Sequence, residues 1–229
     1  MDRLTKIFNC IPPSRVVADI GCDHGQLTAM LLTQNKAERA VAADISPKSL
    51  AKAVKLCGAL KIQDRADFRQ GDGLNVLAQG EADTIVIAGM GGHLIADMLR
   101  RNPGVAKQAF LVLCPHTHED ILRKYLLTYG YAITAETLAL EDGRYYQIIC
   151  ARFDGLKHDA ADDFYYTIGQ KLLEGRDGLL AGYLTYRLRL ARDIAESAGK
   201  SGGERAAREA EKMKAFAGRL EEVLKCLQP

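Results

Sequence analysis

The sequence predicts an α/β fold in which helices cover both faces of a mostly parallel sheet. In the first two thirds of the chain, short apolar segments alternate with helical stretches. The apolar segments are almost continuous, which is typical of strands buried on both faces of a parallel sheet. The last two strand-like segments have no helix between them, so the sheet is expected to end in an antiparallel hairpin.

Five parallel strands and this hairpin are expected within residues 1–155. The parallel strands are predicted at residues 16–20, 40–44, 67–70, 84–88 and 109–113. Helices should follow the first, second, fourth and fifth strands, through residues 27–32, 47–56, 94–99 and 121–126. The hairpin strands are predicted at 131–138 and 145–151, on either side of the turn-forming sequence Glu-Asp-Gly at 141–143.

Residues 156–229 are predicted to form an appended α-helical hairpin. Apolar residues recur there at alternating spacings of three and four, the pattern of a seam between paired helices. The seam positions are Leu184, Leu188, Ala191, Ala195 and Ala198 in one stretch and Ala206, Ala210, Met213, Ala217, Leu220, Leu224 and Leu227 in the other. Residues 197–203 are expected to be the turn. The alternative is that both helices pack back onto the sheet.

The composition is that of a globular protein and excludes several other classes. The 229 residues include 31 Lys+Arg and 29 Asp+Glu, so a nucleic-acid partner would have to bind to a local basic patch. The apolar runs are shorter than the roughly 18 residues of a membrane span, and no signal-peptide segment follows the charged first residues. The six cysteines form no CxxC pair, which favours reduced thiols. We therefore expect a cytoplasmic protein with no membrane partner.

The most informative segment is Asp-Ile-Gly-Cys-Asp-His-Gly at residues 19–25, directly after the first strand. A glycine-rich turn there lets a ligand approach the backbone at the carboxyl edge of the sheet. Dinucleotide-binding folds have Gly-x-Gly-x-x-Gly at this place, but here Asp23 replaces the second glycine and would repel a pyrophosphate. A carboxylate suits a ligand with an amino group and a sulfonium. The segment is thus similar to the first motif of S-adenosylmethionine-dependent methyltransferases, with Asp19, Gly21 and Gly25 in cofactor-binding positions.

Carboxylates also follow the second and third strands. Asp44 ends the second strand, where a carboxylate can accept hydrogen bonds from both hydroxyls of a ribose. Its alternative role is to cap the next helix, although Ser46 can also do this. Ile45 would pack against an adenine face. Asp72, followed by Gly73, would accept a hydrogen bond from the adenine amino group, unless this Gly-Asp-Gly is only a turn.

The fourth strand ends in the small residues of the segment 88–92, Ala-Gly-Met-Gly-Gly. Enzymes that methylate exocyclic amines on bases often have Asn or Asp-Pro-Pro-aromatic here, and this pattern is absent. Because glycine weakens the start of the following helix, we expect a functional reason, namely close approach of the backbone to a ligand. Ala88, Gly89 and Met90 are predicted to contact the cofactor, and Gly91 the substrate. A tight turn alone is the alternative.

These segments resemble one family, the bacterial tRNA (adenine-22)-N1-methyltransferases. The motifs that carry the resemblance are Ala-Asp-Ile-Gly-Cys-Asp-His at 18–24, Gly-Asp-Gly-Leu at 71–74 and Ile-Ala-Gly-Met-Gly-Gly-His-Leu-Ile at 87–95, with further matches at 113–116, 122–126, 130–131 and 141–146. The resemblance covers roughly residues 1–155, and the family's helical C-terminal appendage matches in kind. It implies a Rossmann-like class I methyltransferase sheet, S-adenosyl-L-methionine as cofactor and methyl transfer to N1 of adenine 22 in tRNA.

The chain departs from the family pattern at two places. The first motif of the family usually reads Ser-Asp-His-Ala, where this chain has Cys-Asp-His-Gly at 22–25. After the fifth strand the family usually has Gln-Pro-Asn, where this chain has Cys114, Pro115 and His116, which are predicted to contact the substrate. Two alternatives therefore stay open. One is a methyltransferase that acts on another RNA or a small molecule, and the other is a non-catalytic S-adenosylmethionine-binding scaffold that contacts a partner through its helices.

A mechanism follows from the chemistry of adenine N1. Its in-plane lone pair can attack the methyl group without prior deprotonation, so catalysis depends first on alignment. Methylation leaves a positive charge on the ring, which a nearby carboxylate can stabilise or relieve by accepting the amino proton. Asp23 is the candidate, with a helix cap or a cofactor contact as its alternative role, and His24 would orient it or face the substrate. No covalent nucleophile and no metal are expected.

Binding of tRNA would depend mainly on contacts with phosphates, after the adenine is exposed or flipped. The basic candidates are Arg3, Lys6, Arg100, Arg101, Arg123 and Lys124, together with Arg187, Arg189 and Arg192 on the appended helix. These last three are predicted to bind the body of the tRNA. Contact with another protein through the same helices is the alternative, and no obligate protein partner is predicted.

Overall fold

The computed structural model describes residues 2–227 of the chain. Its strands are β1 (Ser14–Ile20), β2 (Ala37–Asp44), β3 (Ala66–Gln70), β4 (Thr84–Met90), β5 (Phe110–Pro115), β6 (Tyr131–Glu141) and β7 (Arg144–Phe153). Its α-helices are α1 (Arg3–Cys10), α2 (Gln26–Thr33), α3 (Pro47–Ala59), α4 (Gly92–Arg101), α5 (Pro103–Ala106), α6 (Glu119–Thr128), α7 (Asp163–Ile168), α8 (Gln170–Gly175), α9 (Leu180–Ser201) and α10 (Glu204–Leu227). Short 3₁₀ helices flank β3 at Gln63–Arg65 and Gly73–Val76.

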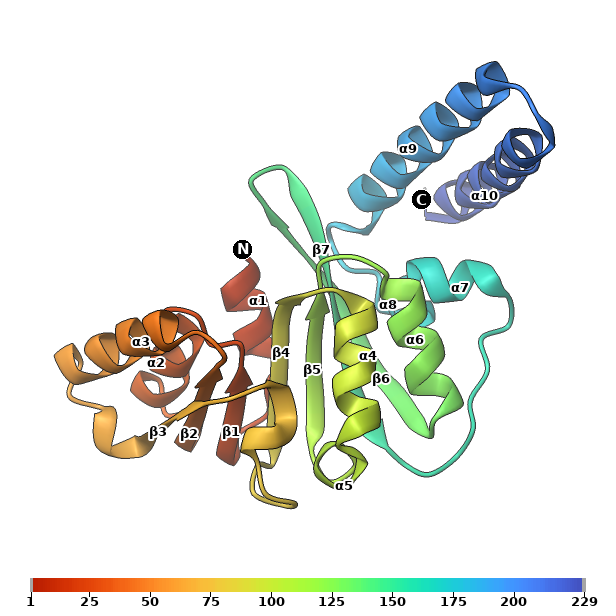
Figure 1. Cartoon of the computed structure of the whole chain (residues 1–229). Coiled ribbons are helices and arrows are strands. Elements are labelled where there is room, and N and C mark those ends of the chain that lie inside the picture. The colour runs from red at the N-terminus through yellow and green to blue at the C-terminus, as the bar shows by residue number, and fades with distance from the viewer. Residues whose placement is uncertain (1, 228–229) are drawn as a thin grey trace. The chain divides into compact units, whose positions relative to one another are not determined.

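The described strands form one seven-stranded sheet in the order β3-β2-β1-β4-β5-β7-β6 (Figure 1). Strands β1 to β5 are parallel, whereas β7 runs antiparallel to both β5 and β6. This confirms the predicted sheet of five parallel strands that ends in an antiparallel hairpin. The strand order reverses between β1 and β4, and in open α/β sheets such a reversal opens a crevice at the carboxyl ends of the strands.

Both faces of the sheet are buried because successive side chains of a strand point to opposite faces. Ala18 and Ile85 belong to the apolar cluster that contains residues of α4 and α6. Their neighbours Val17 and Val86 belong to the cluster that contains residues of α1 and α2. The almost continuous apolar strands of the sequence therefore reflect two separate layers of helices.

The sequence pattern did not predict α1. This eight-residue helix buries only Ile7 and Phe8, two adjacent positions that set up no helical period. Its start does carry a recognisable cap, because the Asp2 side chain accepts a hydrogen bond from the Thr5 backbone N–H at 2.8 Å. The helix packs against β6 and β7, and this position makes it part of the site described below.

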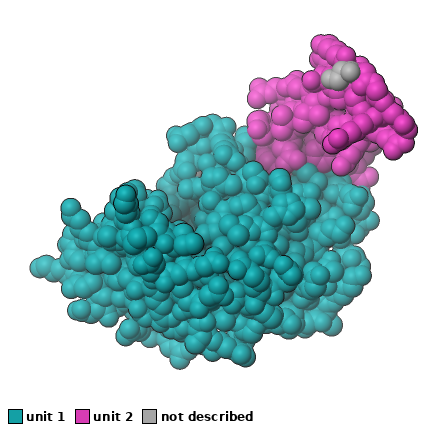
Figure 2. All heavy atoms as spheres, in the orientation of Figure 1, with its two compact units in different colours: residues 1–175 teal, residues 176–229 magenta. Residues whose placement is uncertain are grey.

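The chain divides into two compact units, 1–175 and 176–229 (Figure 2). The sheet unit thus extends beyond residue 155, where the sequence pattern set the boundary. The extension consists of α7 and α8, which pack on α6 and β6 and bury Phe164, Ile168 and Leu172. These short helices belong to the sheet unit because their apolar side chains are covered by it.

The second unit is the helical hairpin of α9 and α10. The buried side chains of its described part include Leu184, Ala191, Ala210, Ala217 and Leu220, which are all positions of the predicted seam. The turn is shorter than predicted. Helix α9 continues through Ser201, and only the following two glycines, with φ of 68° and 89°, leave the helical conformation. No helix in the described range is both long and apolar enough to cross a membrane.

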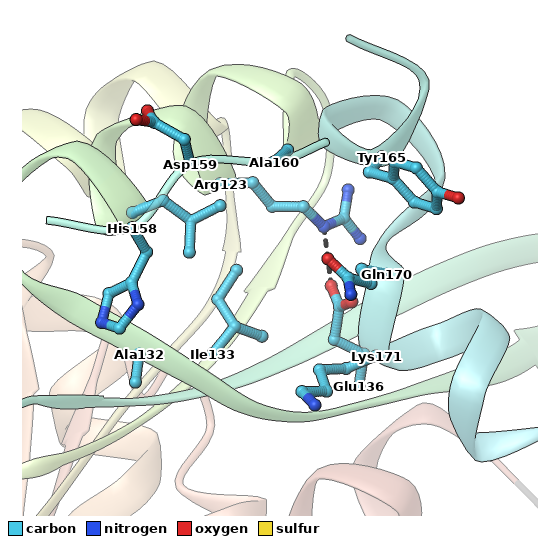
Figure 3. A pocket seen from close by; sticks show the side chains of 11 residues that line it. Arg123, Ala132, Ile133, Glu136, His158, Asp159, Ala160, Tyr165, Gln170 and Lys171 are labelled. Atoms are coloured by element: carbon cyan, nitrogen blue, oxygen red, sulfur yellow. Dashed lines mark hydrogen bonds and ion pairs between the residues drawn. The ribbon is translucent and has the colours of Figure 1, made fainter. Parts of the chain in front are cut away.

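Arg123, a candidate RNA contact, is instead a structural residue of the sheet unit. Its side chain is only 1% exposed and donates from Nε to Glu136 Oε1 at 2.6 Å. The same guanidinium donates to Gln147 and to the main-chain oxygen of Tyr166 at 2.8 Å. Figure 3 shows the Arg123–Glu136 pair beside a cavity of about 290 Å³. Because the pair is already satisfied, Arg123 can bind no phosphate and instead ties α6 to the hairpin.

Arg123→Met is expected to lower the free energy of unfolding by about 3–5 kcal/mol, because it leaves the Glu136 carboxylate buried without its partner. Urea denaturation monitored by circular dichroism measures this change. The matched control is Lys124→Met, at the next and exposed position of α6, which should shift stability by less than about 0.5 kcal/mol. A loss below about 1 kcal/mol for Arg123→Met would contradict a structural role for the pair.

Candidate active site

A cavity of about 550 Å³ lies at the carboxyl ends of β1 and β4, where the strand order reverses. Its lining residues come from helices α1 and α2, from the end of β1 and the turn after it, from the end of β4, from the loop after β5 and from β7. They are Arg3, Leu4, Ile7, Asp19, Gly21, Cys22, Asp23, His24, Gln26, Leu27, Ala88, Gly89, His116 and Tyr146. The structure thus brings the two predicted catalytic residues together with several predicted cofactor and substrate contacts.

The turn after β1 is held open by its glycines and tied to β2. The backbone N–H groups of Gly21 and Cys22 both donate to the Ala43 oxygen, at 2.8 and 2.9 Å. Gly21 and Gly25 have φ of 76° and 73°, values that favour glycine. At Gly25 there is also no room for a side chain, because a Cβ would lie 2.6 Å from the Cβ of Ala53 on α3. Gly25 therefore lets α2 begin close to α3, and Gly21 lines the cavity.

Gly25→Ala is expected to lower the free energy of unfolding by about 1–3 kcal/mol, through strain at positive φ and overlap with Ala53. Gly58→Ala is the control, because Gly58 lies within α3 and a Cβ there meets nothing within 4 Å. That substitution should stabilise the protein by about 0.5–1 kcal/mol. Urea denaturation of both variants measures the difference, and equal stabilities would contradict the close packing at Gly25.

The thiols are mostly withdrawn from solvent. Cys22, Cys57, Cys114 and Cys150 are buried, whereas Cys226 on α10 is exposed. Burial raises the pKa of the Cys22 thiol far above its usual range, so Cys22 stays protonated although it lines the cavity. A protonated thiol is a poor nucleophile, and the absence of a covalent step stays a prediction.

Asp19 is a buried carboxylate in the wall of the cavity. It is 6% exposed and accepts a hydrogen bond from Thr28 Oγ1 at 2.8 Å. Burial raises its pKa to about 6, which the hydrogen bonds from Thr28 only partly offset. It forms no ion pair with a described residue. A buried carboxylate in a cavity wall that has no ion-pair partner of its own fits a ligand that supplies a cation.

Asp44 orders the turn instead of capping α3. Its Oδ2 accepts from the backbone N–H of Asp23 at 3.0 Å, and its Oδ1 accepts from that of Ser46 at 2.8 Å. Ser46 itself is the N-cap of α3, since its side chain accepts from the Ser49 backbone N–H. The capping alternative therefore belongs to Ser46. Each oxygen of Asp44 keeps capacity for a further hydrogen bond, so a ribose contact stays a prediction.

The other predicted cofactor contacts, which follow β2 and β3, are not among the residues that line this cavity. Ile45 is 69% exposed, which leaves its apolar side chain free to cover a planar ring. Asp72 forms an ion pair with Arg101 at 3.2 Å, which occupies one of its oxygens. Gly73 has φ of 57° and packs near Met98. Their roles stay predictions. Arg101 is already paired with two carboxylates, Asp72 and, at 2.8 Å, Asp97.

Asp23 and His24 lie next to each other at the cavity. Asp23 has a left-handed φ of 46°, and its Oδ1 accepts a hydrogen bond from Ser49 Oγ at 3.3 Å. His24 Nε2 is 3.4 Å from the same carboxylate and 2.8 Å from Lys52 Nζ. The Asp23 side chain is 70% exposed, so it can reach a ligand. Because an ammonium can only donate, His24 Nε2 accepts from Lys52, and a role of His24 in orienting Asp23 stays a prediction.

The glycines after β4 allow two loops to approach each other. Gly92 N–H donates to the Thr117 oxygen at 2.7 Å, and a Cβ at Gly92 would collide with the main-chain oxygen of His118. Gly91 is the N-cap of α4, and a Cβ there would lie 3.3 Å from Thr117 Oγ1. Gly92 is therefore required for close packing of two backbone segments, which explains why part of this segment is glycine without any contact to a ligand.

Ala88 and Gly89 line the cavity directly, whereas Met90 is not among its lining residues. A Cβ on Gly21 would lie 2.5 Å from the Met90 methyl group, so Met90 packs against the turn after β1. Met90 therefore supports the turn that lines the cavity. A direct contact between Met90 and the cofactor stays a prediction.

Of the predicted substrate contacts after β5, only His116 reaches the cavity. Cys114 is fully buried in the apolar cluster on the side of α1 and α2, so its side chain cannot touch a substrate. Pro115 is buried as well. The prediction was wrong for Cys114 because β5 continues through Pro115, so Cys114 lies inside the sheet and not in the loop after the strand. Within residues 2–227, no three His, Cys, Asp or Glu side chains gather as a metal site requires.

Sequence reasoning missed several lining residues on α1 and β7. Leu4 and Ile7 of α1 and Tyr146 of β7 were not predicted, and Arg3 was named only as a basic candidate. The cap at Asp2 and the aromatic pair at 145–146 were the available signals. Neither shows that the first helix lies against the hairpin, because that contact joins opposite ends of the sheet unit.

The three predicted RNA-binding arginines of α9 have different surroundings. The Arg187 guanidinium lies 5.7 Å from the ring centres of both Tyr183 and Phe216, and donates to the Tyr183 hydroxyl. Arg192 forms an ion pair with Glu221 at 2.7 Å. Arg189 is exposed, 5.9 Å from the Tyr186 ring. Arg187 thus contributes to packing within the hairpin, and Arg189 is the best placed to meet a phosphate.

The parallel sheet, the glycine-rich turn after β1 and the carboxylate that ends β2 together define a class I methyltransferase. A family model described as a methyltransferase domain matches residues 1–149. The tRNA (adenine(22)-N(1))-methyltransferase of Bacillus subtilis is 36% identical over 162 residues, which cover 70% of this chain and 67% of that protein. The chain belongs to the tRNA (adenine-22)-N1-methyltransferase family, which confirms the resemblance seen in its motifs.

Other relatives agree with this assignment. A putative tRNA methyltransferase of Mycoplasma pneumoniae is 34% identical over 151 residues, covering 64% of this chain and 68% of that protein. The crystal structure of the B. subtilis m1A22 tRNA methyltransferase matches with a TM-score of 0.84 at 28% identity, and covers 97% of both chains. A putative tRNA (m1A22) methyltransferase of Streptococcus pneumoniae, solved with S-adenosyl-L-methionine, has the same fold, with a TM-score of 0.82 at 24% identity over 98% of this chain and all of that one.

Proposed function

We propose that this chain transfers a methyl group from S-adenosyl-L-methionine to N1 of adenine 22 in tRNA. The observation that carries the proposal is the buried Asp19, which has no cationic partner among the described residues and shares a cavity with the exposed carboxylate of Asp23. The buried carboxylate of Asp19 suits a cationic cofactor, and the exposed carboxylate of Asp23 suits a base that becomes cationic. Membership of the family supplies the position of the base.

The residues at the ends of β1 to β4 have the chemistry that this cofactor needs. When bound, S-adenosylmethionine supplies an electrophilic methyl group on a sulfonium. Asp19 and the turn of Gly21 and Gly25 would hold its amino acid part, with Ala88 and Gly89 beside them. Asp44 would accept from the ribose hydroxyls, and Ile45, Asp72 and Gly73 would surround the adenine.

Asp23 would act on the developing charge of the target base. Its carboxylate stabilises the positive charge on the adenine ring, or accepts a proton from the amino group. Ser49 Oγ donates to Asp23 Oδ1 at 3.3 Å and holds this oxygen in place. Cys22 stays protonated beside them and takes no covalent part.

The decisive experiment is methyl transfer to defined transcripts followed by nucleoside analysis. Wild-type protein should form 1-methyladenosine on a tRNA with adenine at position 22, and none on the same tRNA with guanine there. Methylation of the guanine variant, or only of another RNA or a small molecule, would contradict the substrate. Cofactor binding without transfer to any RNA would favour the scaffold alternative.

We further propose that α9 binds the body of the tRNA, with Arg189 as the main contact. Arg189→Glu should weaken tRNA binding by about tenfold and lower the slope of log affinity against log salt by about one or more. Filter binding at several salt concentrations measures both values. The control is Lys212→Glu on α10, an exposed position with the same change of net charge. Equal effects of the two variants, or unchanged affinity for Arg189→Glu, would exclude α9 as the RNA-binding helix.

Localisation and partners are further parts of the proposed function. We propose that it acts in the cytoplasm, where its thiols stay reduced, on tRNA and without an obligate protein partner. Size-exclusion chromatography coupled to activity measurements tests the last point, since activity should elute with the isolated chain.

A further inference from the structure

Three segments that are far apart in the sequence meet on one side of the active-site cavity. Arg3 of α1, His116 after β5 and Tyr146 of β7 line the cavity, and Arg144 of β7 lies beside them. Arg3 Nη1 is 3.2 Å from His116 Nε2, and Arg144 Nη2 donates to the main-chain oxygen of His116 at 2.8 Å. The packing of α1 against the β6–β7 hairpin creates this arrangement (Figure 1).

The Tyr146 ring holds both guanidinium groups. The Cζ atoms of Arg3 and Arg144 lie 4.8 and 5.4 Å from the centre of the ring, which are cation–π distances. The His116 ring meets Tyr146 edge-on, with ring centres 5.7 Å apart. Two long and flexible side chains are thereby ordered before any ligand binds, which lowers the entropy that binding costs.

The cluster has an excess of positive charge. Arg3 is partly compensated, because its Nε is 3.6 Å from Glu141 Oε2. Arg144 forms no ion pair with a described residue and is exposed. His116 adds no charge, because burial and the nearby Arg144 and Arg3 guanidiniums lower its pKa. Since a guanidinium can only donate, His116 Nε2 is the acceptor in its contact with Arg3 and the ring proton is on Nδ1.

We propose that Arg144, assisted by Arg3, binds a phosphate adjacent to the target nucleotide and so fixes the base in the cavity. This inference rests on the proposed function. A flipped base brings its flanking phosphates to the rim of the cavity that receives it, and an arginine fork matches two phosphate oxygens. Tyr146 and His116 are positioning residues, because they act through the two guanidiniums.

The test is a double-mutant cycle between the protein and the RNA. A tRNA is assembled from synthetic halves with a neutral methylphosphonate in place of the phosphate on the 5′ or the 3′ side of adenine 22. On unmodified tRNA, Arg144→Gln should lower kcat/KM by about 10- to 100-fold, mainly through KM, because it removes a charged hydrogen bond. On the tRNA with the relevant methylphosphonate, the same variant should cause no further loss.

Two controls separate this role from a structural one. Arg152→Gln neutralises an exposed arginine at the other end of β7 and should leave kcat/KM unchanged on both RNAs. Affinity of Arg144→Gln for S-adenosylmethionine, measured by calorimetry, should equal that of the wild type. Tyr146→Leu should raise KM in the same direction as Arg144→Gln, whereas Tyr146→Phe should restore it, because the aromatic ring does the positioning.

The outcomes distinguish this inference from the proposed function. If the wild type methylates adenine 22 but the effects of Arg144→Gln and of either methylphosphonate simply multiply, the phosphate site is wrong and the function stands. If the wild type forms no 1-methyladenosine at adenine 22, the function itself is overturned and the inference falls with it. Coupling at one of the two phosphates supports the inference and identifies that phosphate.

Discussion

Asp19→Asn is expected to weaken S-adenosylmethionine binding by about 100-fold, because it removes the buried negative charge that faces a cationic ligand. The same substitution should make the ligand-free protein more stable. Burial raises the pKa of Asp19 from 3.8 to about 6, so the ionised carboxylate costs roughly 3 kcal/mol of folding free energy at neutral pH. Asparagine keeps the hydrogen bond from Thr28 and avoids that cost.

The sign of the pH dependence follows from the direction of this pKa shift. The folded state holds the Asp19 proton more tightly than the unfolded chain does. The unfolding free energy of the ligand-free wild type should therefore fall as pH rises from 3.8 to about 6. Asp19→Asn should remove this part of the slope, which urea denaturation at a series of pH values measures.

Calorimetry and thermal unfolding with and without cofactor check the binding half of this prediction. Asp64→Asn, at an exposed position near β3, also removes one negative charge and should change neither the cofactor affinity nor the stability of the ligand-free protein. An Asp19→Asn protein that binds cofactor as tightly as the wild type would contradict the cofactor role of this carboxylate. A variant that loses both stability and binding would show that Asp19 is structural.

Asp23→Asn is expected to lower the rate of methyl transfer by about 100-fold or more at saturating tRNA and cofactor, because the amide cannot neutralise the charge that forms on adenine. Asparagine is the informative replacement, since it adopts the left-handed conformation of this position, φ 46°, more readily than alanine does. Single-turnover measurements of 1-methyladenosine give the rate, and calorimetry should show cofactor binding within about threefold of the wild type.

Asp142→Asn is the matched control for this substitution. Asp142 is also an exposed aspartate at a left-handed φ, 49°, but it lies in the turn between β6 and β7. Its single-turnover rate should equal that of the wild type. Full turnover by Asp23→Asn with normal cofactor affinity would show that the charge of Asp23 takes no part in the chemistry.

The parts of the fold that follow from local pattern were predictable from the sequence. Buried parallel strands appear as apolar runs, because both of their faces meet helices, and the order of strands and helices then leaves few topologies. The turn after β1 was recognisable because its glycines and carboxylates lie within seven consecutive residues, 19–25, so the motif can be seen without knowledge of distant contacts. Asp19 and Asp23 were found in this way, and the structure places both at one cavity.

The parts that depend on contacts between distant segments were not predictable. Arg123 looks like a surface cation until Glu136 is seen beside it, and that partner lies on another strand. Helix α1 completes the cavity through Arg3, whose partners lie more than 100 residues away. Cys114 was placed in a loop because the apolar run ends at residue 113, whereas β5 continues through Pro115 and buries this side chain.

The distribution of thiols makes the native chain convenient to label. Cys226 is exposed near the end of α10, Cys10 of α1 is half-buried, and the other four cysteines, including Cys22 in the active-site wall, are buried. A maleimide fluorophore should therefore attach first to the helical hairpin and leave the catalytic cavity untouched. Anisotropy or energy transfer from that dye would then report tRNA docking in real time, without any engineered cysteine.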